Sequence, residues 1–210
     1  MILVELLVFE HVDLLDVGGP YEVLLTANRL ARRQQRAEPF AVTTVGASVA
    51  PVRAYGGLRI IPDRAVGDEG CDVLVVPGAV DVAAVVADGT TLAAIRRAAA
   101  GAKLLTSVCT GSLLLGAAGR LAGAGAATTH HEDLAALAEY LDPTRVIGGV
   151  AWVDAGTLVT AGGLANGLGM ALHLVHRLVD RQLAEQVATN LGVPWSPGDG
   201  VTVPSAPPLP

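Results

Sequence analysis

Three short apolar runs, each followed by a segment of helical character, constrain the fold of this chain more than any other feature. They cover residues 1–9, 72–76 (DVLVV) and 103–108 (KLLTSV). Nearly continuous apolar runs of this length are typical of strands buried on both faces, and such strands occur in parallel sheets covered by helices. The alternation of strands and helices therefore predicts an α/β fold, a three-layer sandwich around a mostly parallel sheet.

Glycine, proline and other turn residues divide the rest of the chain into further elements. We expect additional strands at 39–45, 126–129, 146–152 and 157–160, a β-hairpin over 49–61, and helices at 21–35, 83–100, 110–118, 132–141 and 164–191. No internal repeat or linker separates them, so residues 1–192 are predicted to form one domain. Residues 193–210 are rich in proline and are expected to form an irregular tail.

The composition limits the possible functions. Apolar residues make up 51% of the 210 residues and charged residues only 16%, which is typical of a compact protein rather than a disordered one. The formal net charge of −6 argues against nucleic acid as a partner, and no apolar run is long enough for a membrane span. The two cysteines, Cys71 and Cys109, are far apart, so we expect no disulfide framework and a cytoplasmic location.

Three residues that could carry chemistry follow the predicted strands. Asp16 comes after the first strand, Gly78 after DVLVVP and Cys109 after KLLTSV. Ligands bind beyond the carboxyl ends of the strands in an open parallel sheet, so we expect these residues to lie together. The convergence of three candidates at one edge is stronger support for a site than any one of them.

Cys109 stands where a strand turns sharply into a helix. Such a turn places the side chain above the sheet edge, and the N–H groups of Thr110 and Gly111 would stabilise a thiolate and lower its pKa. A free cysteine is also commonly a small buried apolar residue, and the spacing alone leaves both interpretations open. Asp16 also has an interpretation without a role in catalysis, because a helix follows it and aspartate is a common N-cap.

The run His130-His131-Glu132 raises the question of a metal site. Neighbouring side chains of an extended segment point to opposite sides, and no further set of residues has metal-ligand spacing. The sequence therefore predicts no metal.

Several blocks of the sequence resemble one known superfamily. The segment VCTGSLLLGAAGRLAGAGAATTH (108–130) is similar to the nucleophile segment of the ThiJ/PfpI superfamily, within the class I glutamine amidotransferase-like fold. VLVVPGA, LDVGGPYEVL and LVTAGGLANGLGMALHLVHRLV match other blocks in the same order, so the resemblance covers residues 1–192. It implies a flavodoxin-like sandwich in which Cys109 is reactive.

The residues around Cys109 distinguish between branches of this superfamily. Thr110 stands where the peptidase-like branch has histidine, and Asp16 stands where glyoxalase-like and deglycase-like proteins usually have glutamate. LDVGGPYEVL together with CTGSLLLGAAG is most similar to isonitrile hydratases, and equally similar to the ligand-sensing domain of AraC-type transcription regulators. The resemblance also assigns the N–H of Gly78 to an oxyanion site, beside Ala79 where the superfamily often has glycine.

The resemblance to isonitrile hydratases implies an enzyme that converts isonitriles to N-substituted formamides without a cofactor. The implied catalytic residues are Cys109, Asp16 and Thr110, and the implied substrate-binding residues are Gly78, Ala79 and His130. The expected partners are a small-molecule substrate and a second copy of the chain in a homodimer. The alternatives are another hydrolase or amidase of the superfamily, or a sensor that binds a small molecule or oxidises at its cysteine.

Overall fold

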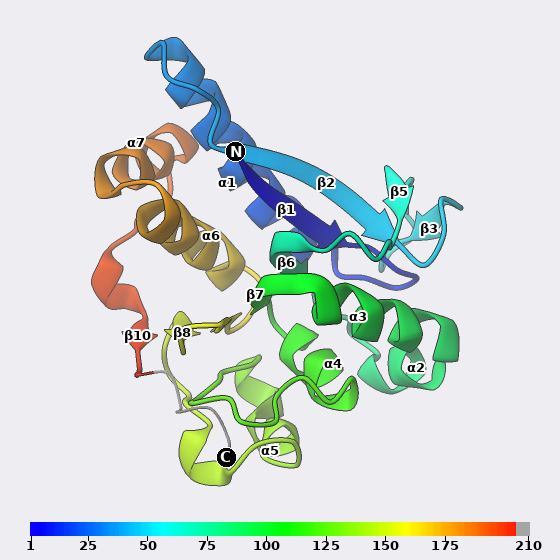
Figure 1. Cartoon of the computed structure of the whole chain (residues 1–210). Coiled ribbons are helices and arrows are strands. Elements are labelled where there is room, and N and C mark those ends of the chain that lie inside the picture. The colour runs from blue at the N-terminus through cyan, green and yellow to red at the C-terminus, as the bar shows by residue number, and fades with distance from the viewer. Residues whose placement is uncertain (205–210) are drawn as a thin grey trace.

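The computed structural model describes residues 1–204, and within them eight strands form one sheet (Figure 1). The strand order is β10-β8-β9-β7-β6-β1-β2-β5, and the only antiparallel pair in it is β8 with β9. The strands are β1 (Ile2–Leu7), β2 (Phe40–Gly46), β5 (Arg64–Ala65), β6 (Cys71–Val76), β7 (Ala102–Ser107), β8 (Trp152–Asp154), β9 (Leu158–Ala161) and β10 (Val201–Thr202). The three apolar runs form β1, β6 and β7, which are adjacent and parallel, as predicted.

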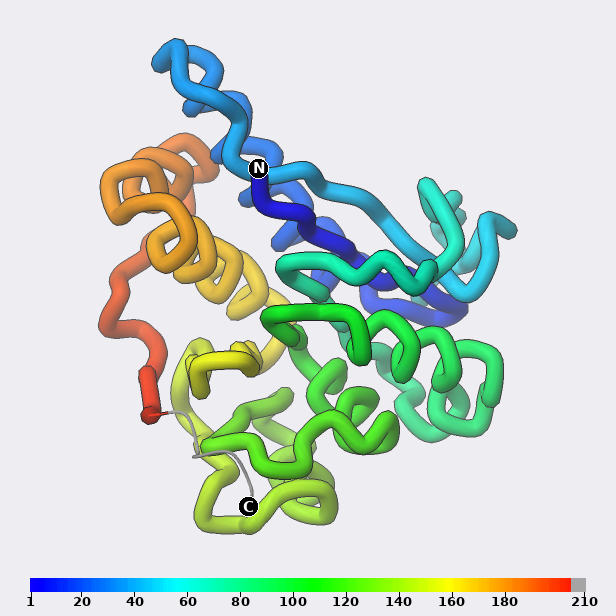
Figure 2. The backbone as a smooth tube through the Cα atoms, in the orientation of Figure 1, coloured from blue at the N-terminus to red at the C-terminus, as the bar shows by residue number. Residues whose placement is uncertain are grey.

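Helices cover both faces of the sheet, which confirms the predicted three-layer sandwich (Figures 1 and 2). On one face α1 (Leu14–Arg33), α6 (Asn166–Leu178) and α7 (Arg181–Leu191) pack against one another. On the other face lie α2 (Val82–Ala87), α3 (Gly89–Gly101), α4 (Gly111–Ala117) and α5 (Leu134–Leu137). Valine, leucine and alanine fill the interior between the layers. The predicted hairpin forms from β3 (Val52–Arg53) and β4 (Arg59–Ile60).

The first helix begins earlier than predicted. It starts at Leu14, so that Gly18, Gly19 and Pro20 lie inside it rather than before it. A Cβ on Gly19 would lie 3.4 Å from Cγ of Leu168, which shows how closely α1 and α6 approach each other there. Gly19 therefore marks a packing contact between helices, at a position that the sequence analysis placed before the helix.

Two predicted long helices are each divided by an aspartate. The helix expected over 83–100 ends at Ala87, and Asp88 caps α3 by accepting a hydrogen bond from the N–H of Thr90. The helix expected over 164–191 is divided in the same way by Asp180, which caps α7. Aspartate is among the strongest N-caps, and this signal was missed because the apolar pattern continues past it.

The segment between α4 and β8 is less regular than predicted. The expected strand over 126–129 contains only an isolated bridge between Ala127 and Val146. The helix expected over 132–141 is divided into a 3₁₀ turn, His131–Asp133, and the short helix α5.

Residues 193–203 are not the irregular tail that the sequence suggested. Ser196 and Asp199 form a capping box around a 3₁₀ turn, and β10 then pairs with β8. The indole N–H of Trp195 donates to the carbonyl oxygen of Gly169 at 3.1 Å, and Gly200 lies against the ring of Trp152. These contacts attach the segment to α6 and β8, while 205–210 lie outside the described residues.

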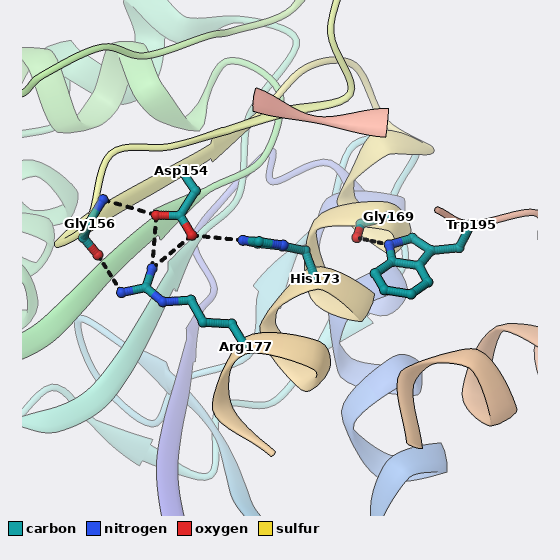
Figure 3. A network of polar contacts seen from close by, with 6 residues as sticks. All are labelled: Asp154, Gly156, Gly169, His173, Arg177 and Trp195. Atoms are coloured by element: carbon teal, nitrogen blue, oxygen red, sulfur yellow. Dashed lines mark hydrogen bonds and ion pairs between the residues drawn. The ribbon is translucent and has the colours of Figure 1, made fainter. Parts of the chain in front are cut away.

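A buried polar network lies beneath this segment (Figure 3). The carboxylate of Asp154 on β8 contacts Nε2 of His173 at 2.7 Å and accepts from Nη1 of Arg177 at 2.9 and 3.0 Å. Nη2 of Arg177 donates to the carbonyl oxygen of Gly156 at 2.7 Å. The network therefore fixes the turn between β8 and β9 to α6.

Candidate active site

Cys109 occupies the turn between β7 and α4, and its backbone lies in the left-handed region with φ of 55°. This conformation costs a non-glycine residue about 1–3 kcal/mol and persists only where the surroundings hold it. The N–H of Cys109 donates to the carbonyl oxygen of Gly162 at 2.9 Å, and its carbonyl oxygen accepts from Oγ1 of Thr129 at 3.1 Å. Gly111 permits the sharp turn because a Cβ there would overlap the backbone of β6. The predicted strand-to-helix elbow is confirmed.

Asp16 lies in the first turn of α1, and its side chain is completely buried. Its Oδ2 accepts a hydrogen bond from the N–H of Gly78 at 2.9 Å, whereas its Oδ1 has no hydrogen-bond partner among the described residues. Burial raises the pKa of Asp16 to about 7, against the lowering effect of the Gly78 hydrogen bond and with a further raising effect from Asp13. A buried carboxyl group of this kind is suited to exchange a proton near neutral pH.

The N-cap of α1 is Asp13, whose Oδ1 accepts from the N–H of Leu15 at 3.1 Å. The alternative reading of Asp16 as a helix cap is therefore wrong. Its burial has no explanation in helix capping, which strengthens the case for a role in the site.

The thiol of Cys109 does not have the low pKa that its position predicts. Burial raises its pKa to about 12, and the negative charge of Asp16 raises it further, while the N–H groups of Thr110 and Leu164 lower it. The start of α4 does supply a stabilising N–H, but desolvation outweighs it. At neutral pH Cys109 is therefore a thiol beside a carboxyl group that is about half ionised, because the pKa of Asp16 is about 7.

Leu164 is a site residue that the sequence analysis did not single out. Its N–H acts on the thiol together with that of Thr110. The signal available in the sequence was the pair Gly162-Gly163 just before it, since small residues let a backbone approach a neighbour closely. A Cβ on Gly163 would lie 3.0 Å from Cδ2 of His130, which confirms the close approach.

The hydroxyl group of Thr110 fixes the loop after β6. It donates to the carbonyl oxygen of Ala79 at 2.8 Å and accepts from the N–H of Ala79 at 2.9 Å. A Cβ on Gly78 would lie 2.6 Å from Oγ1 of Thr110 and 2.8 Å from Oδ2 of Asp16, so only glycine fits between them.

The N–H of Gly78 is committed to Asp16, which contradicts its expected place in an oxyanion site. The N–H groups that face the thiol belong to Thr110 and Leu164 instead.

Cys109 lines a cavity of about 220 Å³. Thr110, Ala79 and His130 line it as well, so four of the predicted site residues meet there. Asp16 and Gly78 are not in the lining. The complete lining is Asp13, Ala79, Val80, Cys109, Thr110, His130, Glu132, Asp133 and Leu164.

A wider groove of about 670 Å³ adjoins this cavity and shares Val80, Thr110 and Asp133 with it. The side chains of α2, α4 and α5 form half of its wall. The remaining lining residues are Asp81, Val82, Ala83, Val86, Ala87, Leu113, Ala136, Glu139 and Tyr140.

The geometric argument against a metal site at His130-His131-Glu132 is wrong. The segment His131–Asp133 forms a 3₁₀ turn rather than extended chain, so neighbouring side chains need not diverge. The ligand atoms of His130, His131 and Glu132 all lie within 4.8 Å of one another, and the two imidazole centroids are 4.3 Å apart.

Comparison with known proteins places this site in a family. The model of the DJ-1/PfpI family matches residues 3–177. The chain belongs to the DJ-1/PfpI family. That assignment confirms the resemblance to ThiJ/PfpI proteins and the flavodoxin-like sandwich expected from it.

Individual family members are similar over most of the chain. The isonitrile hydratase of Pseudomonas putida is 36% identical over 209 residues, which is 95% of this chain and 84% of that protein. A ThiJ/PfpI family protein from Pseudomonas syringae is 30% identical, with a TM-score of 0.78 over 93% of this chain and 77% of that one. An AraC family transcriptional regulator from Pseudomonas putida is 25% identical, with a TM-score of 0.73 over 91% of this chain and 100% of that one.

A helix that crosses a membrane must be both long and apolar. Among the described residues, no helix of this chain has both properties.

Proposed function

We propose that this DJ-1/PfpI protein is a cysteine-dependent hydratase that converts isonitriles to N-substituted formamides. The observation that carries the proposal is the position of the Cys109 thiol at the strand-to-helix elbow, close enough to the buried Asp16 carboxyl group for the charge of Asp16 to act on it. The similarity to the isonitrile hydratase of Pseudomonas putida supports the same chemistry.

The first chemical step adds the thiol across the terminal carbon of the isonitrile R–N≡C. The carbon–sulfur bond forms as the carbon receives a proton, giving the thioimidate R–N=CH–S–Cys109. Asp16 relays that proton from sulfur to carbon, and its charge is restored at the end of the step. Because the pKa of Cys109 is raised and the group is a thiol at neutral pH, the Asp16 carboxylate has to take the thiol proton as the carbon–sulfur bond forms.

The second step hydrolyses the thioimidate. A water molecule adds its hydroxyl group to the carbon and a proton to the nitrogen, giving R–NH–CH(OH)–S–Cys109, with Asp16 again carrying the proton. Cleavage of the carbon–sulfur bond then releases the formamide R–NH–CHO and returns the proton to Cys109. The N–H groups of Thr110 and Leu164, which face the sulfur, stabilise negative charge on it as it leaves.

The apolar groove beside the cavity is where we place the R group of the substrate. An isonitrile has no hydrogen-bond donor at its reacting end, so its binding must come mainly from burial of R. Val82, Val86 and Leu113 give the groove an apolar wall, and the shared residues Val80 and Thr110 connect it to the cavity of Cys109.

Formamide release from phenyl isonitrile and methyl isonitrile tests this proposal. The wild-type protein should turn over both repeatedly, whereas a sensor would bind or react once. In Ala83→Trp the indole ring occupies the groove, so the phenyl group can no longer be buried there. The kcat/KM for phenyl isonitrile should then fall by on the order of 10–100-fold, which corresponds to the free energy of burying an aromatic ring. With methyl isonitrile it should change by no more than about twofold.

Ala84→Trp is the matched control, because Ala84 is an exposed neighbour on α2 that does not line the groove. Equal losses in the two variants would contradict the placement of R. Absence of turnover with every isonitrile would contradict the hydratase itself.

We also propose that the chain forms a homodimer through apolar side chains near the start of α1. Leu14 and Leu15 are exposed there, and the N–H of Tyr55, whose side chain is 60% exposed, donates to the carbonyl oxygen of Val12. The hairpin and α1 thus present neighbouring apolar groups, which a second copy would cover. Light scattering should give about twice 21.3 kDa at micromolar concentration, and a mass of 21.3 kDa would contradict the dimer.

A further inference from the structure

The cavity beside Cys109 carries an unbalanced negative charge. Asp13, Glu132 and Asp133 line it, and no lysine or arginine does so among the described residues. Within the described part of the chain, none of these three carboxylates has a lysine or arginine nitrogen within 4.0 Å. An isonitrile is uncharged, so the proposed hydration gives this charge no function. A cation would balance it.

The side chains at one side of the cavity already have a separation close to that of metal ligands. Nδ1 of His130 lies 3.8 Å from Oε2 of Glu132 and 3.5 Å from Oδ2 of Asp133. With bonds of about 2.1 Å, neighbouring ligand atoms of a tetrahedral site are about 3.4 Å apart. Small rotations of these side chains, of which His131 and Glu132 are exposed, would therefore bring the ligand atoms to that separation.

We infer that His130, His131 and Glu132 form a binding site for a divalent transition-metal ion such as Zn²⁺. Two imidazoles with one carboxylate match the ligand preference of Zn²⁺, Co²⁺ or Ni²⁺, whereas Mg²⁺ and Ca²⁺ take oxygen ligands. Three protein ligands leave one position of a tetrahedral ion for water or another ligand. Asp133 adds negative charge next to the ion.

The location of the site gives the metal a consequence for access to the thiol. His130 and Glu132 line the same cavity as Cys109, so a bound ion would occupy part of the volume of about 220 Å³ that a ligand must enter. The site is independent of the proposed hydratase activity, because it rests on the charge and geometry of the cavity wall alone.

Titration calorimetry with ZnCl₂ tests the site in protein freed of metal by a chelator. Cys109→Ala serves as the background, so that the thiol cannot take the ion. We expect one Zn²⁺ per chain, with Mg²⁺ unable to compete. His131→Asn and Glu132→Gln should each weaken binding by at least about tenfold, since even partners outside the ligand shell are worth that much.

His11→Asn and Glu139→Gln are the controls, because both side chains are exposed and neither lines the cavity. Asparagine also tolerates the left-handed backbone of His11, φ 64°. All four substitutions are at exposed positions, and circular dichroism verifies that each variant is folded. Failure of the background to bind Zn²⁺, or equal affinities in ligand and control variants, would overturn the inference.

Discussion

Cys109→Ala should abolish formamide release from any isonitrile. The thiol forms the covalent bond to carbon in the proposed mechanism, and Cys71, the other sulfhydryl group, lies buried in β6 with a pKa raised to about 12, mainly by burial. Alanine keeps the Cβ and the backbone of the elbow, so the fold should persist. The measurement is the initial rate of formamide production, followed by chromatography, with circular dichroism as the test of folding.

Cys71→Ala provides the matched control, since it removes the other buried thiol of the chain. It should retain turnover, because the side chain lies at the opposite end of the sheet from the elbow, at the first residue of β6. Wild-type rates in Cys109→Ala would refute covalent catalysis. A rate reduced in both variants alike would point to general loss of packing instead.

Asp16→Asn should lower kcat by about 10²–10⁴-fold, the usual contribution of one group that transfers protons. Asparagine can still accept the hydrogen bond from Gly78, but it cannot carry a proton between sulfur and carbon. In the wild type the active form has one proton shared by Cys109 and Asp16, whichever of the two holds it. The kcat of the wild type should therefore rise as the pH increases through about 7, the pKa of Asp16. In Asp16→Asn this rise of kcat with pH should be absent.

The same substitution should stabilise the protein at pH 8. Burial raises the pKa of Asp16 from 3.8 to about 7, so the folded state binds a proton between these values that the unfolded state does not. Wild-type stability therefore improves as pH falls from about 7 towards 4, and above pH 7 the buried charge is unfavourable. Asp16→Asn removes that charge and should gain on the order of 2 kcal/mol at pH 8, with a smaller gain at pH 5.

Thermal unfolding of the two proteins at both pH values measures this effect. Asp81→Asn is the control, because Asp81 is the exposed N-cap of α2, asparagine caps a helix as well as aspartate does, and Asp81 does not act on the pKa of Asp16. A lower Tm for Asp16→Asn than for the wild type at pH 8 would show that the buried carboxylate does not destabilise the fold. A variant that loses activity and gains stability would indicate a group retained for function.

The central sheet could be predicted because its signal is local. The runs that became β1, β6 and β7 are mostly apolar and short, and that composition at that length is typical of a strand buried on both faces. The boundaries of the helices could not be predicted as well. Gly18, Gly19 and Pro20 are common turn residues, yet all three lie inside α1, and the contact of Gly19 with Leu168 of α6 joins segments that no window of sequence contains.

The candidate active site also has features that the sequence predicts and features that depend on contacts between distant segments. Cys109 and Asp16 could be located because both follow strand ends, and the topology brings such ends together. The partner of Gly78 and the proximity of Leu164 depend on contacts between distant segments. The thiol pKa was predicted in the wrong direction because the sequence shows a helix start but does not show the depth of burial around it.

Both edges of the sheet end in two-residue strands, β5 on one side and β10 on the other, within residues 1–204. An exposed edge strand can recruit a strand from another molecule, and a longer edge is a better template for such growth. Here each edge offers too short a row of free backbone groups to hold an incoming strand in register. Copies of this protein should therefore meet through side chains on their surfaces, and crowded solutions should resist fibre formation.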